Sequence, residues 1–449
     1  MLTLLRIVAI ALLIAAAPAT QSVPPDRPYP DPPAWVRDLT MYEVNLRQFS
    51  ESGNLEGFGK QLPRLKELGV GVLWFMPLHP IGIEARSGTL GSPYAVRNYT
   101  AFNPEFGNID QFKAVVDEAH RMGMYVIIDW VANHTAPDHP WVKQHPDWYT
   151  RDKDGQLVHP TADWKDVVDL NFGVQDMRAE MIDAMAFWVR NTGIDGFRCD
   201  AAAMVPLDFW VDARNALRKI RPVFLLGEGV ETNLMDHAFD ATYAWYLTEN
   251  IEGIAQGKKT VSDLANYLNA DARVVANNGF RLNFTTNHDK NSWEMPASER
   301  FGKGLDAFTV LTFTVPGMSL IYNGQEAGLD RRLKFFEHDP ITWRDDPAAK
   351  LYRTLAKLKR DHPALWTGSA GGKLHIAEGA AEAQVLCFER EVGDDRVVVM
   401  LNLSGASQRA GAPKGVEKLN EVFGQKIAMD ADGKILLDAW SYRVWASGR

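Results

Sequence analysis

Gly196-Phe197-Arg198-Cys199-Asp200 has the composition of a short buried strand that ends in charge. Side chains alternate between the two faces of a strand, so Arg198 and Asp200 point the same way and the guanidinium can hold the carboxylate ionised. A charged aspartate at the end of a strand can serve as a nucleophile. A structural ion pair has the same spacing, so this stretch alone leaves both interpretations open.

Similar β-rich runs alternate with longer amphipathic stretches along the chain, which is the pattern of parallel strands joined by helices. The predicted strands cover residues 41–45, 71–76, 124–129, 196–200, 223–228, 238–241, 281–286 and 318–322. The clearest helical patterns cover residues 55–68, 109–121, 174–191 and 207–220. Eight such units predict an α/β fold, a (β/α)8 barrel of the TIM type.

Two segments depart from the repeating units of the barrel. Segment 132–175 is too long for a strand-to-helix loop, so we expect a small inserted subdomain after the third strand. After a predicted helix at 347–360, strand-rich runs appear at 383–390, 396–403 and 441–445, separated by turn residues. We therefore expect residues 20–365 to form the catalytic barrel with its insertion, and residues 366–449 to form a C-terminal β-sandwich domain of antiparallel strands.

The amino terminus has the form of a secretory signal peptide over residues 1–19. Arg6 precedes an apolar stretch at 7–17, and Ala17-Pro18-Ala19 supplies small residues for cleavage. The apolar stretch is too short for a comfortable membrane span, and no other stretch could span a membrane. We therefore expect a secreted or periplasmic protein that has no membrane partner once the signal is cleaved.

Composition limits the classes of partner. The chain has 449 residues, of which 46% are hydrophobic and 23% charged, enough for a large globular domain and a smaller one. A formal charge of −9 and the absence of basic runs argue against nucleic acid as a partner. Cys199 and Cys387 lie in different predicted domains, so we expect two free thiols. The oligomeric state stays open.

Charged and polar side chains gather where four of the predicted strands end. The carboxyl ends of barrel strands meet on one face, so these side chains should converge there. Three convergent carboxylic acids fit glycosidic bond cleavage, which needs one acid and one nucleophile or base. The groups are Asp129 and His134 after the third strand, Arg198 and Asp200 in the fourth, Glu228 in the fifth, and His288 and Asp289 after the seventh.

The surroundings of the three acids suggest different roles. Asp200, paired with Arg198, should stay ionised and attack the anomeric carbon. Glu228 follows two leucines and a glycine, and an apolar setting raises the pKa of a carboxyl group. Glu228 would then protonate the leaving oxygen and later activate water. Asp289 would stabilise the positive charge of an oxocarbenium-like centre or hold sugar hydroxyls.

These motifs resemble four conserved regions of the α-amylase family of retaining glycoside hydrolases, glycoside hydrolase family 13. The resemblance covers nearly all of the mature chain, with the four regions at 129–134, 196–200, 227–228 and 287–289. It implies a barrel enzyme that cleaves α-1,4-glucosidic bonds in maltodextrin or starch-like α-glucans, and a covalent glycosyl intermediate on Asp200. The substrate partner would be an α-glucan or a maltooligosaccharide.

The same resemblance implies roles for residues that bind the sugar. Ser92-Pro93-Tyr94 resembles a family loop whose tyrosine stacks on the sugar in the cleaved subsite, so Tyr94 is the candidate. His134 and His288 would bind hydroxyls of that sugar, and Arg198 would position the nucleophile.

The chain departs from the family pattern just beyond the nucleophile. Many α-amylases have a lysine and a histidine where this chain has Ala203 and Met204, which weakens the expectation of long-chain starch binding. The chemistry needs no cofactor and no metal ligand is assigned. A structural calcium ion stays open, because Asn133 and Asp169 match family ligand positions and offer oxygen donors.

Other functions of the same barrel also stay open. An α-glucosidase, a cyclodextrin hydrolase or an α-glucan transferase would use the same chemistry. A non-catalytic relative acting as a binding module belongs to another class. Such relatives lose the acids, whereas this chain keeps Asp200, Glu228 and Asp289, so we favour an enzyme.

Overall fold

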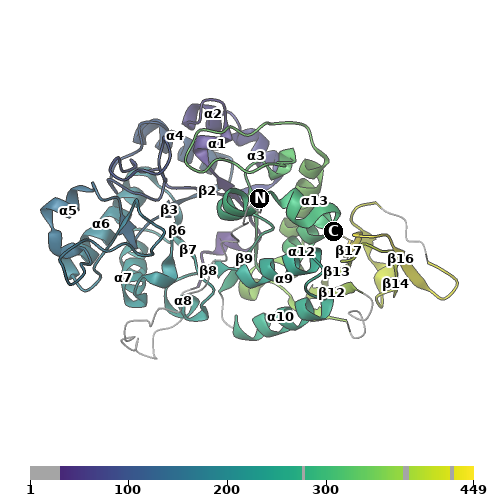
Figure 1. The fold of residues 1–449 in the computed structure, drawn as a ribbon. Coiled ribbons are helices and arrows are strands. Elements are labelled where there is room, and N and C mark those ends of the chain that lie inside the picture. The colour runs from purple at the N-terminus through teal and green to yellow at the C-terminus, as the bar shows by residue number, and fades with distance from the viewer. Residues whose placement is uncertain (1–30, 276–278, 378–383, 425–428, 449) are drawn as a thin grey trace, which may run out of the picture.

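A closed barrel of parallel strands forms the centre of the molecule (Figure 1). The computed structural model describes residues 31–275, 279–377, 384–424 and 429–448, and the predicted signal peptide lies outside them. The strand order around the barrel is β1-β10-β9-β8-β7-β6-β3-β2, which confirms the predicted (β/α)8 fold. These strands are β1 (Thr40–Val44), β2 (Val70–Phe75), β3 (Tyr125–Trp130), β6 (Gly196–Cys199), β7 (Phe224–Gly227), β8 (Ala241–Tyr243), β9 (Phe280–Asn283) and β10 (Met318–Tyr322).

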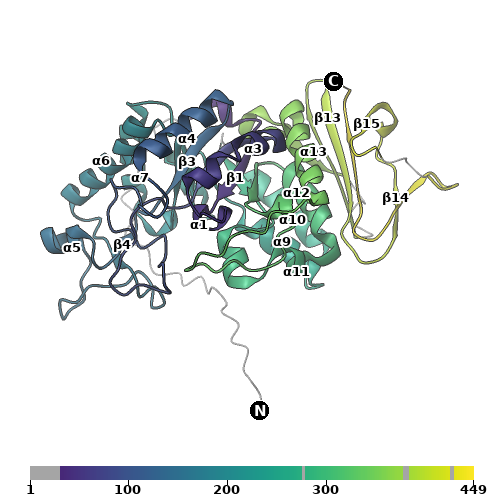
Figure 2. The ribbon, with the colours of Figure 1, turned by 90° about the horizontal axis from the view of Figure 1, so that it is seen from above.

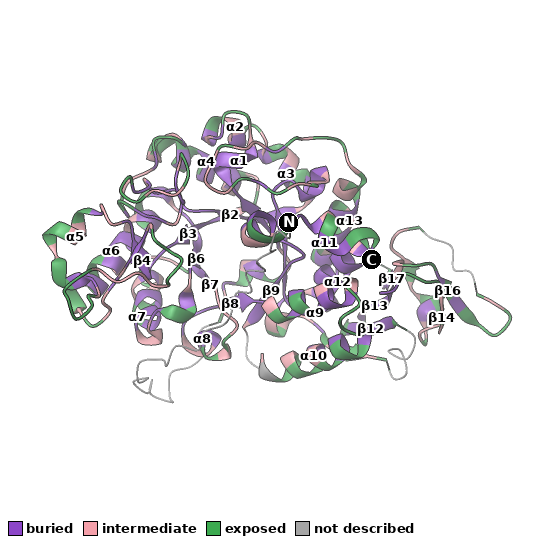
Figure 3. Cartoon of the chain, in the orientation of Figure 1, coloured by how far each residue is buried: buried purple, intermediate pink, exposed green. Residues whose placement is uncertain are grey.

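Helices cover the outside of the barrel, and their exposed residues lie on the outer faces (Figure 3). In α4 (Ile109–Arg121), Asn108 and Gln111 form a capping box, and Phe112, Val116 and Ala119 are buried. The other large helices are α6 (Gln175–Thr192), α7 (Leu207–Arg218), α9 (Trp245–Ala255), α10 (Val261–Val274), α12 (Leu305–Thr314) and α13 (Pro347–Asp361). None of the helices in the described ranges is long and apolar enough to cross a membrane.

Strand β6, which carries the Arg-x-Asp motif, lies very close to β7. A Cβ atom at Gly196 would be 1.9 Å from the carbonyl oxygen of Phe224, so no larger residue fits there. Parallel pairing then places Arg198 opposite Asp129 of β3 and Leu226 of β7. The motif therefore lies inside the barrel with its neighbours in fixed register.

Two predicted elements differ from the structure. The helix predicted over residues 55–68 is two helices, α2 (Leu55–Gly59) and α3 (Leu62–Leu68), because glycines end the first and a proline begins the second. The weak strand predicted at 238–241 begins only at Ala241, where β8 starts. Asp240 instead forms a buried ion pair with Arg214, and the residues with β propensity follow it.

The insertion and the C-terminal strands lie on opposite sides of the barrel (Figures 1 and 2). In the insertion, β4 (His134–Thr135) pairs antiparallel with β5 (Val168–Asp169), and α5 (Pro140–Gln144) lies between them in sequence. The C-terminal strands form an antiparallel five-stranded sheet and a two-stranded sheet. They are β11 (Lys373–Ile376), β12 (Val385–Val392), β13 (Asp395–Asn402), β14 (Gln408–Gly411), β15 (Asn420–Glu421), β16 (Lys434–Leu437) and β17 (Tyr442–Ala446).

Two buried cations join the barrel to the C-terminal sheet. Arg390 of β12 donates to the carbonyls of Thr314, Val315 and Leu365 at 3.2–3.3 Å, so it caps the end of α12. Lys359 of α13 donates to the carbonyls of Gly317 at 2.7 Å and Leu365 at 2.9 Å. Both side chains are almost fully buried, and burial lowers the pKa of Arg390 to about 9.

Candidate active site

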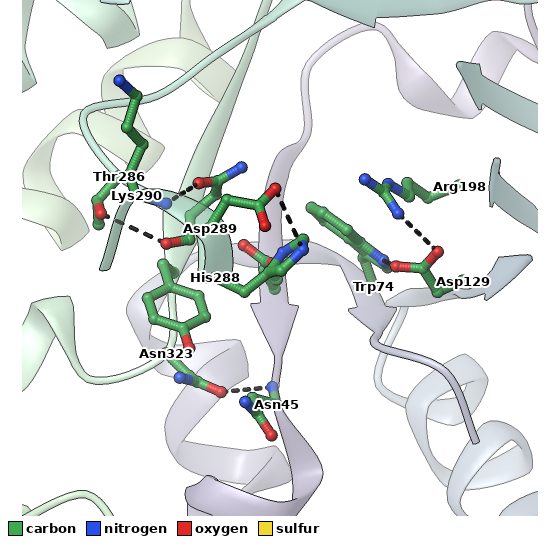
Figure 4. Close-up of polar contacts among 12 residues, drawn as sticks. Asn45, Trp74, Asp129, Arg198, Thr286, His288, Asp289, Lys290 and Asn323 are labelled. Carbon is green, nitrogen blue, oxygen red and sulfur yellow. Dashed lines mark hydrogen bonds and ion pairs between the residues drawn. The ribbon is translucent and has the colours of Figure 1, made fainter. Parts of the chain in front are cut away.

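Arg198 is in contact with three carboxylates at the carboxyl ends of the strands, and Figure 4 shows it beside one of them, Asp129. Its guanidinium lies 2.8 Å from Asp129, 2.8 Å from Asp200 and 2.9 Å from Glu228, and its side chain is fully buried. The ion pair predicted between Arg198 and Asp200 is thus present, but the same guanidinium also contacts the carboxylates of Asp129 and Glu228. Like charges held this close favour protonation of at least one acid.

Asp200 and Glu228 both have raised pKa values. Burial raises the pKa of Asp200 to about 6, although Arg198 opposes the shift. Burial raises the pKa of Glu228 further, to about 7, again against Arg198 and with help from the Asp200 charge. The pKa of Glu228 is raised, in the direction expected, and its carboxylate contacts the Arg198 guanidinium and the Ala201 N–H.

The backbone just after Asp200 holds Glu228 in place. Ala201 adopts a left-handed conformation with φ of 44°, which is rare for residues other than glycine. In this conformation the Ala201 N–H donates to Glu228 Oε2 at 2.8 Å. The end of β6 therefore positions both acids, one through its side chain and one through its backbone.

His288 and Tyr94 form the second part of the site. The His288 ring lies 2.9 Å from the Tyr94 hydroxyl through Nε2, and the Tyr94 hydroxyl donates to Asp129 at 3.1 Å. The rings of Tyr94 and His288 stack with centroids 5.5 Å apart. Burial would lower the pKa of His288, but Asp289 and Glu43 together raise it to about 9. His288 is therefore a cation at neutral pH.

Asp289 faces the open side of this cluster. Its carboxylate lies 3.4 Å from His288 Nε2, and its side chain is 32% exposed (Figure 4). The Asp289 charge also contributes to the raised pKa values of Asp200 and Glu228. The structure thus brings the three predicted acids into one electrostatic unit, with Asp289 nearest to solvent.

His134 belongs to the edge of the site. It is buried and uncharged, because burial lowers its pKa to about 3, although its ring donates a hydrogen bond to the Tyr94 backbone that favours the charged form. Trp164 of the insertion packs edge-on against its ring at 5.4 Å. His134 therefore connects the insertion to the loop that carries Tyr94.

Four residues that contact this cluster were not predicted from the sequence. Trp74 Nε1 donates to Asp129 at 3.2 Å, and the Tyr243 hydroxyl accepts from Arg198 at 2.9 Å. Glu43 lies against His288, and the ring of Phe335 stacks on Tyr94. Glu43 and Trp74 lie inside strands of ordinary composition. A charged residue within the short buried strand β1 is the one signal that could have identified Glu43.

Asn133 and Asp169, the two residues considered as calcium ligands, lie side by side in the structure. Pairing of β4 with β5 brings Asn133 and Asp169 together, since the Leu170 N–H donates to the Asn133 carbonyl at 3.2 Å. Burial raises the pKa of Asp169, a cost that a bound cation would relieve. Both side chains offer the hard oxygen donors that calcium prefers. Across the described ranges, no group of three or more His, Cys, Asp or Glu residues could hold a metal ion.

A buried arginine in contact with three carboxylates, at the carboxyl ends of the strands of a (β/α)8 barrel, has the arrangement of a glycoside hydrolase site. The chain belongs to the alpha-amylase family, because the family model for the alpha amylase catalytic domain matches residues 44–166 and 148–372.

Individual relatives agree with this assignment. An alpha-amylase from Dictyoglomus thermophilum is 25% identical, over 83% of this chain and 70% of that protein. A cyclomaltodextrinase from Bacillus sp. is 26% identical, over 83% of this chain and 74% of that protein. The crystal structure of an alpha-amylase from Lactobacillus plantarum superposes with a TM-score of 0.81 at 29% identity, covering 92% of this chain and 99% of that one.

Proposed function

We propose that this chain is a retaining hydrolase of α-1,4-glucosidic bonds in maltodextrin or starch-like α-glucans. The observation that carries the proposal is the placement of Asp200 and Glu228 at 2.8 Å and 2.9 Å from the same Arg198 guanidinium, which brings a nucleophile and an acid into one site. The alpha-amylase names of the relatives support an α-glucan as the substrate.

In the first step of this mechanism, Asp200 attacks the anomeric carbon while Glu228 donates its proton to the leaving oxygen. The glycosyl group is then bound covalently to Asp200. In the second step, the Glu228 carboxylate takes a proton from water, and that water displaces Asp200. Arg198 favours the ionised form of each acid in turn. Asp289 and the cationic His288 would hold the sugar between them, with Tyr94 beneath its ring.

Replacing the nucleophile tests this mechanism directly. Asp200→Asn should abolish release of reducing sugar from maltodextrin and leave the protein folded. Azide should restore cleavage of 2,4-dinitrophenyl α-glucoside in the variant by forming a glucosyl azide of inverted configuration. Asp208→Asn is the matched control, because Asp208 of α7 pairs with Arg178 of α6 at 2.8 Å, away from the Arg198 cluster. Normal turnover by Asp200→Asn would remove the assignment.

The product profile separates the alternatives within the family. An α-glucosidase releases glucose from chain ends, a cyclodextrin hydrolase opens cyclodextrins rapidly, and a transferase makes products longer than the substrate. Maltooligosaccharides of graded length, starch and cyclodextrin, assayed together, distinguish these outcomes. A cyclomaltodextrinase among the relatives makes cyclodextrin the most informative of these substrates.

We also propose that the protein is exported from the cytoplasm. Residues 1–19 support export to the periplasm or the medium, where polysaccharides are degraded. Amino-terminal sequencing of the protein recovered outside the cytoplasm would test this, with a mature chain that begins at Thr20 as the expected result.

A further inference from the structure

Tyr243 contacts the site from a strand that carries none of the predicted acids. It is the last residue of β8, and β7 lies between β8 and β6 in the barrel. Its hydroxyl reaches past that strand and accepts a hydrogen bond from Arg198 Nε at 2.9 Å, and both side chains are fully buried. The proposed mechanism gives Tyr243 no role, although hydrogen bonds to a buried charged group are among the strong ones.

The three nitrogens of the Arg198 guanidinium have different partners. Nη1 lies 2.8 Å from both Asp129 and Asp200, and Nη2 lies 2.9 Å from Glu228. Nε, the third nitrogen, donates to Tyr243. Because the guanidinium is planar, the direction of the Nε–H bond also sets where Nη1 and Nη2 point. The Tyr243 hydroxyl therefore helps to fix the distances from Arg198 to both catalytic acids.

The ring of Tyr243 is itself held in place by three neighbouring aromatic rings. It stacks on Trp245 of α9 with centroids 5.5 Å apart, and it meets Phe284 edge-on at 5.8 Å. Trp74 of β2 lies edge-on to it at 6.4 Å. The Tyr243 N–H also donates to the Gly229 carbonyl at 3.1 Å. A side chain restrained in this way can orient a partner at little further cost in entropy.

Aromatic rings also surround the Arg198 guanidinium. Its central carbon lies 5.3 Å from the ring centroid of Trp74, 5.6 Å from that of Tyr243 and 5.7 Å from that of Tyr94. Figure 4 shows Trp74 and Arg198 side by side. The guanidinium has no exposed surface at which water would replace the Tyr243 hydroxyl. Removal of that oxygen would therefore leave a buried N–H of a cation without its acceptor.

The Tyr243 hydroxyl is a neutral acceptor among charged groups. Burial raises the pKa of this hydroxyl well above its ordinary value, although Arg198 opposes the shift. A neutral acceptor leaves the positive charge of Arg198 to the three carboxylates around it. These are Asp129 of β3, Asp200 after β6 and Glu228 after β7, and the charged groups beyond them are Glu43, His288 and Asp289.

We propose that Tyr243 is a positioning residue that fixes the Arg198 guanidinium between Asp200 and Glu228. It acts through Arg198 and touches no substrate. This inference rests on the proposed function, because it concerns the two acids that the mechanism uses. It assigns a part in the reaction to β8, the one strand between those of Glu228 and Asp289 that supplies no acid.

The kinetic test removes only the hydroxyl. In Tyr243→Phe, kcat on maltopentaose should fall about tenfold or more with KM nearly unchanged. A guanidinium that is no longer fixed opposes protonation of Asp200 and Glu228 less, so both limbs of the pH profile of kcat/KM should move to higher pH. Tyr352→Phe is the matched control, because Tyr352 is a buried tyrosine of α13 that packs against Phe313. An unchanged kcat and pH profile in Tyr243→Phe would overturn the proposal.

A second background shows whether Tyr243 acts through Arg198. Arg198→Lys has no Nε–H, so adding Tyr243→Phe to it should lower kcat by about twofold or less. If the double variant instead loses as much as the product of the two single losses, Tyr243 does not act through Arg198 and the inference fails. Melting temperatures of all variants show whether each one is folded.

A measurement without substrate keeps this inference separate from the proposed function. In protein labelled with 15N-arginine, the Arg198 Nε–H signal is identified by its loss in Arg198→Lys. Its exchange with water should be about tenfold or more faster in Tyr243→Phe than in the wild type. Equal exchange rates would overturn the positioning role whatever the activity. A wild type inactive on every α-glucan would instead overturn the proposed function and leave the exchange comparison valid.

Discussion

Glu43 and His288 are 245 residues apart in the sequence, yet Glu43 Oε1 lies 2.5 Å from His288 Nδ1 inside the barrel. Glu43 is fully buried, so this contact fixes the orientation of the His288 ring. With Nδ1 bound to Glu43, the other ring nitrogen faces Tyr94 and Asp289. Glu43 is therefore a positioning residue that keeps His288 charged where the sugar would bind.

Removing the Glu43 charge should weaken His288 as a cation. In Glu43→Gln we expect a lower His288 pKa and a fall in kcat/KM of about 10- to 100-fold, the effect of losing one buried charge-assisted hydrogen bond. Titration of the His288 ring followed by NMR measures the first effect. Glu56→Gln, an exposed substitution on α2, is the control. An unchanged His288 pKa in Glu43→Gln would refute the positioning role.

The two catalytic acids predict a narrow pH optimum. Activity should rise as Asp200 ionises with a pKa of about 6 and fall as Glu228 loses its proton with a pKa of about 7. The profile of kcat/KM against pH on maltopentaose should therefore be bell-shaped with its maximum between these values. A profile that stays flat well above the Glu228 pKa would contradict the assignment of Glu228 as the acid.

The raised pKa of Glu228 also predicts a stability cost. The folded protein binds this proton more tightly than the unfolded chain, with a pKa of about 7 against 4.5, so stability falls as pH rises through that interval. Glu228→Gln has no carboxyl group to ionise at this position, so its stability should not fall for this reason. Its melting temperature should exceed that of the wild type by about 2–4 °C at pH 8 and equal it at pH 5. Calorimetry at the two pH values measures the difference. A larger rise in melting temperature at pH 5 than at pH 8 would contradict a raised pKa of Glu228.

A calcium ion held by Asn133 and Asp169, the possibility left open by the sequence, would make the melting temperature depend on the metal. Calcium added after EDTA treatment should stabilise the wild type by a few degrees and have no effect on Asp169→Ala. Asp152→Ala is the control, because Asp152 accepts hydrogen bonds from its own turn, from the N–H groups of Asp154 and Gln156. An equal response of the wild type and Asp169→Ala would rule out Asp169 as a ligand.

Strand patterns predicted the barrel well because parallel strands are buried on both faces and stand out as apolar runs. The strand around Ala241 was misplaced because it has three residues and begins beside a buried ion pair. The small strands β11 and β14–β16 were not predicted, since two- to four-residue edge strands have no periodicity to detect.

The site was predictable only as far as local motifs reach. Arg198 lies in β6, and Asp200, Glu228 and Asp289 follow strands in recognisable spacing. Phe335 and Glu43 meet the site through barrel closure, because β10 pairs with β1 and the loop after β10 crosses the top. The closure of the barrel brings together parts of the chain that are nearly 300 residues apart. Gln48 and Glu337, for example, form a hydrogen bond across a separation of 289 residues. No local sequence pattern predicts such a contact.

The buried Arg390 has a consequence for how the enzyme can be divided. Its guanidinium satisfies carbonyls at the end of α12, a helix of the barrel. A chain cut before β11 would lose Arg390, and the carbonyls at the end of α12 would then have no donor from the C-terminal sheet. Lys359, which donates to the nearby Gly317 carbonyl, would lose the cover of that sheet. The C-terminal sheet thus supplies hydrogen bonds to a helix of the barrel, so its removal should destabilise the barrel as well.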